Sequence, residues 1–174
     1  SEFLREKIKS AVNHPDYDHP LTGLKVVVDA GNGAGGFFVE KVLQPLGADT
    51  TGSQFLDPDG TFPNHIPNPE NEEAMASICK AVLDNGADLG IIFDTDVDRS
   101  SAVDKNGREV SRNAIIALAA ALVCQDHPGT TIVTDSVTSD ELAVFLEKDL
   151  GCVHHRFKRG YKNVINEAIR LNNE

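Results

Sequence analysis

Short β-branched runs alternate with stretches of helical periodicity along this chain, and this alternation restricts the fold more than any other feature. Leu24–Val28 and Leu89–Phe93 are apolar runs with the length and composition of buried strands. A glycine-rich turn, a helical stretch over Phe37–Leu46 and a further strand within Ala48–Leu56 lie between them. Such alternation is typical of α/β folds, in which helices cover a sheet.

A loop and another helix are predicted before the strand at Leu89–Phe93. Residues 57–68 are rich in Pro, Gly and Asn, and Asn68 followed by Pro69 fits a helix cap and a first helical residue. This helix is expected to end before Gly86. Beyond the strand, two short segments around an Asn-Gly turn predict a terminal hairpin, Ser101–Asp104 with Arg108–Val110.

The alternation restarts after residue 110. Ser111 can cap a helix through Val123, and the apolar sequence of that helix predicts heavy burial. Two strand–helix pairs are predicted to follow, namely Thr131–Thr134 with Asp140–Leu150, and Cys152–Phe157 with Lys162–Leu171. We therefore expect an α/β protein of two successive three-layer units with mixed sheets, the second one truncated. The expected parts are an N-terminal helix and linker (1–20), a first unit (21–110) and a partial second unit (111–174).

The composition indicates a folded, acidic protein. Of its 174 residues 40% are hydrophobic, which is enough for a core, and the net charge of −11 argues against a nucleic-acid partner. The longest apolar run, Ala114–Cys124, is too short to span a membrane, and the N-terminus has no apolar secretory core, so we expect a cytoplasmic protein. The three cysteines, Cys79, Cys124 and Cys152, have no metal-binding spacing and are predicted to be reduced thiols, not a disulfide framework.

Three carboxylates, Asp94, Asp96 and Asp98, stand at alternate positions directly after the apolar run Leu89–Phe93. In an extended chain alternate residues point to the same side, so these carboxylates can converge. Two like charges about 4 Å apart repel each other by roughly 4 kcal/mol at an effective dielectric near 20. The group therefore either extends into water as an acidic turn or holds a cation. Oxygen ligands beyond the carboxyl end of a strand favour Mg²⁺ or Ca²⁺.

The residue that follows the carboxylates indicates a phosphate beside the cation. An EF-hand is excluded because, counted from Asp94, the sixth residue is Arg99 instead of glycine and the twelfth is Lys105 instead of glutamate. The guanidinium of Arg99 offers paired donors that suit a phosphate. A salt bridge from Arg99 to a neighbouring aspartate is the alternative, and it is compatible with a phosphate role.

These segments resemble the α-D-phosphohexomutases, the phosphoglucomutase and phosphomannomutase family, whose metal loop reads D-x-D-x-D-R after a buried strand. Asp94–Arg99 looks like that loop, although Thr95 and Val97 stand where the family often has glycine. Further similar segments follow the family's order: Val27–Gly33, Phe62–Pro69 and Asn106–Arg108. The resemblance covers most of residues 21–174 and identifies the two units as the second domain and the first part of the third.

The resemblance implies Mg²⁺-dependent phosphoryl transfer between C1 and C6 of a hexose phosphate through a phosphoserine. Asp94, Asp96 and Asp98 would bind the metal, and Arg99 would hold phosphate. The family's phosphoserine and sugar-selecting loops have no counterpart in these 174 residues, so no catalytic residue is assigned here and the chain alone is expected to be inactive. The resemblance does not distinguish glucose, mannose and glucosamine phosphates.

Other functions fit parts of the same sequence. The segment Gly31–Gly36 reads G-x-G-x-x-G between a strand and a helix, with Asp57 about twenty residues on, as in NAD-binding Rossmann domains of dehydrogenases. An apolar strand followed by D-x-D also resembles haloacid-dehalogenase-type phosphatases, in which Asp94 would be the nucleophile and Asp96 the acid/base. A non-catalytic metal- or phosphosugar-binding module is a further alternative.

Basic side chains concentrate over His154–Lys162. A turn here would lead from a strand into a helix whose N-terminal amides favour anions; a solvated basic turn is the alternative. In the phosphohexomutases a basic residue followed by x-Gly-aromatic faces the substrate at this place. Lys158 matches that residue, so the resemblance assigns it to phosphate or substrate binding, and Arg159 is not assigned. His154 and His155 would point to opposite faces of a strand, which argues against a shared metal site.

The second unit is expected to have an incomplete sheet. Open strand edges and an uncovered apolar face are normally hidden in native proteins. We therefore expect the chain to self-associate through the second unit.

Overall fold

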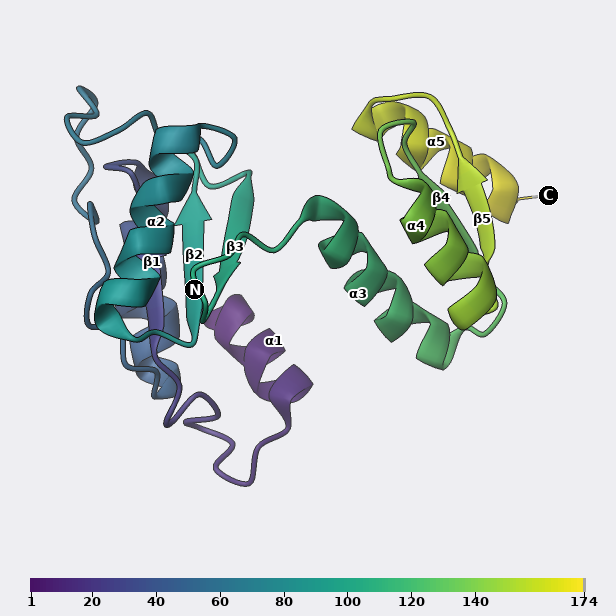
Figure 1. Cartoon of the computed structure of the whole chain (residues 1–174). Coiled ribbons are helices and arrows are strands. Elements are labelled where there is room, and N and C mark those ends of the chain that lie inside the picture. Colours follow the sequence, from purple (N-terminus) through teal and green to yellow (C-terminus); the bar gives the residue numbers. More distant parts are fainter. Residues whose placement is uncertain (174) are drawn as a thin grey trace. The chain divides into compact units, whose positions relative to one another are not determined.

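The structure, a computed structural model, describes residues 1–173 and divides into two compact units (Figure 1). The first unit is Ser1–Val110, and the second begins at Ser111. Each unit combines helices with a small sheet, so the predicted α/β class is confirmed. Among the described residues, no helix combines the length and the apolar character that a membrane crossing requires.

The sheet of the first unit has the order β1-β2-β3. It consists of β1 (Val26–Asp29), β2 (Leu89–Phe93) and β3 (Ser100–Asp104). β1 and β2 are parallel and pair Asp29 with Ile92, whereas β2 and β3 are antiparallel. The carboxyl ends of β1 and β2 therefore lie at the same edge of a mixed sheet, and the loops that follow these strands are neighbours.

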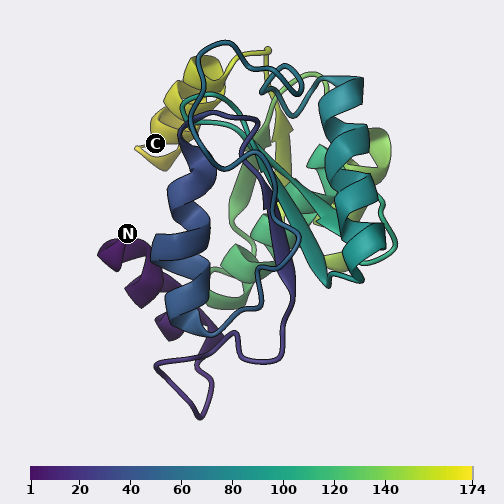
Figure 2. The same cartoon turned by 90° about the vertical axis from the view of Figure 1, so that its left-hand side faces the viewer.

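Both faces of this sheet are covered, which makes the first unit three-layered (Figure 2). Val26 and Val28 of β1 join the core under the helical stretch over 34–46, while Val27 faces the core under α2 (Glu72–Asn85). The stretch over 34–46 comprises η1 (Ala34–Gly36), η2 (Val39–Leu43) and η3 (Gln44–Leu46). An N-terminal helix, α1 (Glu2–Val12), precedes the sheet in the chain. Alternate side chains of one buried strand thus build two cores.

Two predicted strands of the first unit are not formed. Within Ala48–Leu56 only single bridges connect Lys25 with Asp49 and Asp29 with Gln54, because Gly52 and Phe55 adopt positive φ angles of 100° and 53° that interrupt an extended strand. The second arm of the predicted hairpin is reduced to the bridge from Val103 to Glu109.

The start of α2 also differs from the prediction. The helix begins at Glu72, and Asn71 is its cap, accepting a hydrogen bond from the backbone N–H of Ala74. Asn68 is therefore not the cap. Its side chain accepts instead from the backbone N–H of Glu70 and from Arg99.

The second unit contains two parallel strands and helices on their connections. Its elements are α3 (Arg112–Asp126), β4 (Thr131–Thr134), α4 (Asp140–Val144), η4 (Phe145–Asp149), β5 (Val153–Arg156) and α5 (Tyr161–Asn172). Within the described residues the sheet has the order β4-β5 and is wholly parallel, so the expectation of a mixed sheet is wrong for this unit. Ala120, Leu142 and Leu146 form its buried core.

The expectation that α3 is heavily buried is also wrong. Ala120 is its one buried residue, whereas Leu118 and Leu122 are 63% and 57% exposed. The helix is apolar on most of its circumference, and its contacts with α4 and η4 cover one side only. Burial of a helix depends on the surfaces around it, which its own sequence does not supply.

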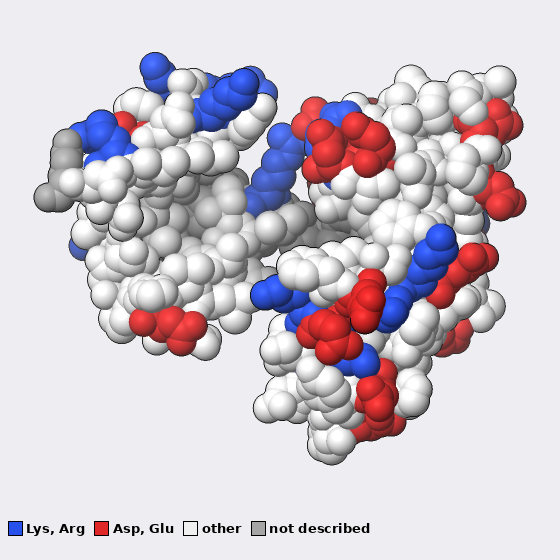
Figure 3. Space-filling view, turned by 180° about the vertical axis from the view of Figure 1, so that it is seen from behind, with Lys and Arg blue, Asp and Glu red and all other residues white. Residues whose placement is uncertain are grey.

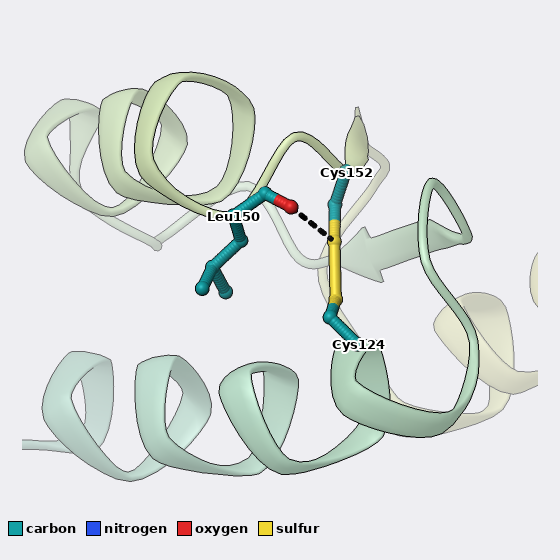
Figure 4. The surroundings of a disulfide bond; sticks show 3 residues. All are labelled: Cys124, Leu150 and Cys152. Atoms are coloured by element: carbon teal, nitrogen blue, oxygen red, sulfur yellow. Dashed lines mark hydrogen bonds between the residues drawn. A yellow bond between two sulfur atoms is a disulfide. The ribbon is translucent and has the colours of Figure 1, made fainter.

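A disulfide joins Cys124 and Cys152, contrary to the prediction of three thiols (Figure 4). The two cysteines are 28 residues apart, at the end of α3 and just before β5. The Leu150 carbonyl oxygen lies 3.9 Å from Cys152 Sγ. Their proximity follows from the docking of α3 against the following helix, which the spacing in the sequence does not reveal. Cys79 remains a free thiol.

Candidate metal and phosphate site

The loop after β2 brings the three predicted carboxylates together. Each of Asp94, Asp96 and Asp98 offers one oxygen, and these oxygens all lie within 4.8 Å of one another. Asp94 is buried at the carboxyl end of β2, while the other two are exposed. The loop can therefore present one enclosed and two accessible oxygen ligands to a hard divalent cation.

The electrostatics of these carboxylates reflect their mutual proximity. Burial acts to raise the pKa of Asp94, but hydrogen bonds from the Arg99 backbone N–H and with Asp98, together with the Arg99 guanidinium, outweigh it and lower that pKa. The pKa of Asp98 is raised, because Asp98 shares a hydrogen bond with Asp94 and is repelled by the charges of Asp96 and Asp94. The raised pKa of Asp98 thus reflects repulsion between neighbouring carboxylates, which a bound cation would relieve.

Arg99 lies against this cluster with part of its guanidinium open. Its Nε donates to Asp94 Oδ2 at 2.9 Å, and its Nη1 donates to Asn68 Oδ1 at 3.3 Å. The predicted salt bridge to a neighbouring aspartate is thus present. The side chain is 56% exposed, which leaves donors for an anion beside the carboxylates.

The glycine-rich segment Gly31–Gly36 contacts the backbone of the carboxylate loop. The backbone N–H of Ala34 donates to the Thr95 carbonyl at 2.9 Å, and a Cβ on Gly33 would lie only 2.7 Å from that oxygen. Gly36 is equally constrained, since a Cβ there would lie 2.1 Å from the Leu56 carbonyl oxygen. Glycine is required here because other backbone segments approach closely.

Val97 has a backbone conformation in the carboxylate loop that glycine would adopt more easily. Its φ angle is 68°, a left-handed conformation that β-branched residues rarely adopt. Its side chain packs against the apolar cluster on the same side of the sheet as Val26 and Val28. Packing therefore holds a backbone conformation that glycine would reach without strain.

The basic turn belongs to the second unit. Gly160 has a φ angle of 117°, and α5 begins at the next residue. Lys158 is exposed, with its Nζ 5.6 Å from the centre of the Phe157 ring. In Figure 3, basic side chains gather along the upper edge of this unit, on the left. Arg159, which the sequence did not assign, lines a cavity of about 680 Å³ together with Thr134 and Asp135 at the end of β4.

The two histidines of β5 have different partners. His154 Nε2 lies 2.7 Å from Thr134 Oγ1, and His155 Nε2 lies 3.1 Å from Glu167 Oε1. Burial is the main reason why the pKa of His154 is lowered.

Sequence reasoning missed Asn68 as a neighbour of the site. The sequence predicts it as a helix cap, although Asn in a Pro-rich loop also forms side-chain turns. In the structure its Oδ1 reaches Arg99. The sequence contains an alternative to Asn68 as the cap, because Asn71, three residues later, is an equally good cap.

Comparison with known proteins gives a consistent match. The family model described as "Phosphoglucomutase/phosphomannomutase, alpha/beta/alpha domain II" matches residues 3–107. A phosphomannomutase of Salmonella montevideo is 42% identical over 119 residues, 66% of this chain and 26% of the relative. A phosphoglucomutase of Neisseria meningitidis serogroup A is 34% identical over 140 residues, 80% of this chain and 30% of the relative.

Solved structures agree with these matches. A phosphoglucomutase/phosphomannomutase family protein from Burkholderia thailandensis superposes with a TM-score of 0.77 at 31% identity, covering 86% of this chain and 32% of that one. An N-acetylphosphoglucosamine mutase of Aspergillus fumigatus, solved with GlcNAc-6P and magnesium, shares the fold with a TM-score of 0.61 at 17% identity, covering 96% of this chain and 34% of that one. The chain thus spans roughly a quarter to a third of the length of these proteins.

Proposed function

The chain belongs to the phosphoglucomutase/phosphomannomutase family, and from this premise we propose that it carries the metal-binding part of a hexose-phosphate mutase. The proposed reaction transfers a phosphoryl group between C1 and C6 of the sugar through a phosphoserine supplied by a segment outside these residues. The observation that carries the proposal is the convergence of the Asp94, Asp96 and Asp98 oxygens within 4.8 Å beside Arg99.

We propose Mg²⁺ as the cofactor because the donor set consists of carboxylate oxygens alone, the ligands that hard cations prefer. When bound, Mg²⁺ would neutralise and orient the oxygens of the transferring phosphoryl group. Arg99 would donate to the same phosphate from the side, since Asp94 already fixes its Nε. Lys158 and the basic turn of the second unit would hold a further phosphate or substrate group.

The glycine-rich segment is better explained as a support than as a dinucleotide site. In a Rossmann fingerprint the second glycine lets a pyrophosphate approach the backbone, and the third allows close packing of the helix on the strand. Here the space beside Gly33 is taken by the Thr95 carbonyl, and the space beside Gly36 by the Leu56 carbonyl. Protein backbone therefore occupies the position beside Gly33 that a pyrophosphate would need.

Titration with Mg²⁺ tests the proposal. We expect Asp96→Ala to weaken Mg²⁺ affinity in calorimetry by about tenfold or more, because one ligand of the cluster is lost. Asp84→Ala, which removes an exposed carboxylate on α2, is the matched control and should leave the affinity unchanged. Equal Mg²⁺ affinities in wild type and Asp96→Ala would refute the assignment of the loop.

We further propose that the 174-residue chain alone does not turn over substrate. The proposed phosphoserine is not among its residues, and Ser136 and Ser139 lie in the connection from β4 to α4, where the Ser139 hydroxyl caps the helix. A mutase assay on the purified chain tests this, and turnover would contradict it. The matched relatives include enzymes named for mannose and glucose phosphates, so the proposal names a hexose phosphate as the substrate class.

A further inference from the structure

Asp29 and His65 form a buried hydrogen-bonded pair that the proposed chemistry does not use. Their side chains are 0% and 2% exposed, and His65 Nε2 lies 3.0 Å from both carboxylate oxygens. The Asp29 oxygens also accept hydrogen bonds from the backbone N–H of Gly31 at 2.9 Å and from Gln54 Nε2 at 2.7 Å. A buried carboxylate is costly unless its oxygens are paired, and here each oxygen is.

This pair ties the end of β1 to the loop over 57–70. Asp29 is the last residue of β1, and His65 lies in the middle of that loop. The His65 ring also packs edge-on against Phe55, with 5.4 Å between ring centres. Because β1 is the parallel neighbour of β2, the anchor lies at the same sheet edge as the carboxylate loop.

A short chain of hydrogen bonds leads from His65 to Arg99. The Ile66 carbonyl lies 3.1 Å from His65 Nδ1 and accepts from the backbone N–H of Asn68 at 2.8 Å. Asn68 Oδ1 then accepts from Arg99 Nη1 at 3.3 Å. The loop held by His65 is thus the loop whose side chain contacts the guanidinium.

We propose that Asp29 and His65 are positioning residues for Arg99. The pair fixes the loop, the loop places Asn68, and Asn68 together with Asp94 holds the guanidinium in the orientation that receives a phosphate. Holding a long, half-exposed side chain in advance reduces the rotamer entropy that phosphate binding would otherwise cost. The inference rests on the proposed role of Arg99 as a phosphate ligand.

A purely structural anchor makes a different prediction from a positioning pair. A structural anchor would change stability alone, whereas a positioning pair also changes phosphate affinity while Mg²⁺ affinity stays constant. The test therefore compares His65→Ala and Asn68→Ala with Val82→Ala. Val82 is buried in the core under α2, so its truncation lowers the stability of the same unit without touching either loop.

The readouts are the Arg99 Nε–H signal in NMR spectra of the metal-free 174-residue chain and titrations with Mg²⁺ and with inorganic phosphate. We expect a slowly exchanging Nε–H in wild type and in Val82→Ala, and faster exchange in His65→Ala and Asn68→Ala. In the last two variants phosphate should bind about three- to tenfold more weakly, the equivalent of one ordinary hydrogen bond, with Mg²⁺ affinity unchanged within twofold. His65→Gln, whose amide can still donate to Asp29, should recover part of the loss.

The outcomes separate this inference from the proposed function. If His65→Ala and Asn68→Ala match Val82→Ala in both the Nε–H signal and phosphate affinity, the positioning role is overturned. If wild type binds no Mg²⁺, the proposed function fails, while the Nε–H signal still decides whether the pair orders Arg99. Should His65→Ala fail to fold, Asn68→Ala decides, because it removes only the contact with the guanidinium and a local turn.

Discussion

At the scale of single residues, the carboxylate loop depends on what lies beneath it as much as on its own aspartates. The Thr95 carbonyl occupies the space that a side chain at Gly33 would need. The backbone N–H of the neighbouring Ala34 donates a hydrogen bond to the same oxygen. Asp94 is enclosed, and Arg99 compensates its charge. The geometry of the carboxylate loop therefore depends on contacts to a segment about sixty residues earlier in the chain.

Gly33→Ala is expected to displace the loop. The added Cβ would lie 2.7 Å from backbone oxygen, so either Thr95 or the glycine-rich segment must move. We expect a loss of about 1–3 kcal/mol in the free energy of unfolding and weaker Mg²⁺ binding in calorimetry. Gly60→Ala is the matched control because nothing lies within 4 Å of the position of its Cβ. Identical behaviour of the two variants would contradict the supporting role of Gly33.

A second residue-scale prediction concerns Glu167 on α5. A hydrogen bond from Arg170 is the largest cause that lowers the pKa of Glu167, and burial opposes it. Since the folded-state pKa lies below the ordinary value of 4.5, the pair stabilises the unit above that pH and the contribution is lost as the pH falls through the lowered pKa.

Unfolding of Glu167→Gln should reveal this dependence. At pH 7 the variant is expected to be less stable than wild type in chemical denaturation, and the difference should shrink as the pH is lowered below about 4.5. Glu147→Gln, an exposed glutamate of the same unit, serves as the control and should show no such convergence. A difference between Glu167→Gln and wild type that persists undiminished in acid would contradict the ion-pair explanation.

At the scale of elements, local side-chain hydrogen bonds determine where three helices begin. Ser111, Asn71 and Ser139 each accept a hydrogen bond from the backbone N–H three residues on. These caps fix where α3, α2 and α4 begin. The start of α2 at Glu72 has a consequence for the site, because it leaves Asn68 in the loop, where its oxygen contacts Arg99.

The formation of strands depends on the segments that pair with them, more than the formation of helices does. The residues over 48–56 have a strand-like composition, yet positive φ angles at Gly52 and Phe55 limit them to isolated bridges. β1 is buried at every residue and β2 at three of its five, and the two strands form by pairing with each other. A strand is stabilised by cross-strand contacts that its own sequence does not contain.

At the scale of the whole molecule, the main feature is that large apolar side chains of the second unit are exposed to solvent. Leu118 and Leu122 lie on α3, and Tyr161 and Ile165 on α5, all more than half exposed. Exposed apolar surface, where it is contiguous, usually marks an interaction site. We propose that the 174-residue chain self-associates through this unit.

Sedimentation velocity tests the proposal. Wild type is expected to show a concentration-dependent increase in sedimentation coefficient, and the double variant Leu118→Lys/Leu122→Lys should sediment as a monomer. Phe3→Lys, which replaces an exposed apolar residue of the first unit, is the control and should behave as wild type. A wild-type chain that stays monomeric at high concentration would contradict self-association.

The sequence by itself determined the α/β class and the family. It also predicted that the three carboxylates converge beside Arg99, because this depends on local spacing, while the phosphate-binding role of the basic turn stays a prediction. It placed Asp94, Asp96 and Asp98 on one side of an extended segment, and their oxygens do meet within 4.8 Å. The sequence does not show which of those carboxylates is buried, because the burial of Asp94 comes from the strands and loops around it.

Only the tertiary structure decided the contacts between segments far apart in the chain. The disulfide of Cys124 with Cys152, the exposure of α3 and the parallel sheet of the second unit all contradict sequence expectations, and each depends on how separate elements dock. The pair of Asp29 with His65 joins residues 36 apart. Sequence patterns report the preference of a segment for helix, strand or turn, whereas the partner of a buried polar group is set by packing across the whole unit.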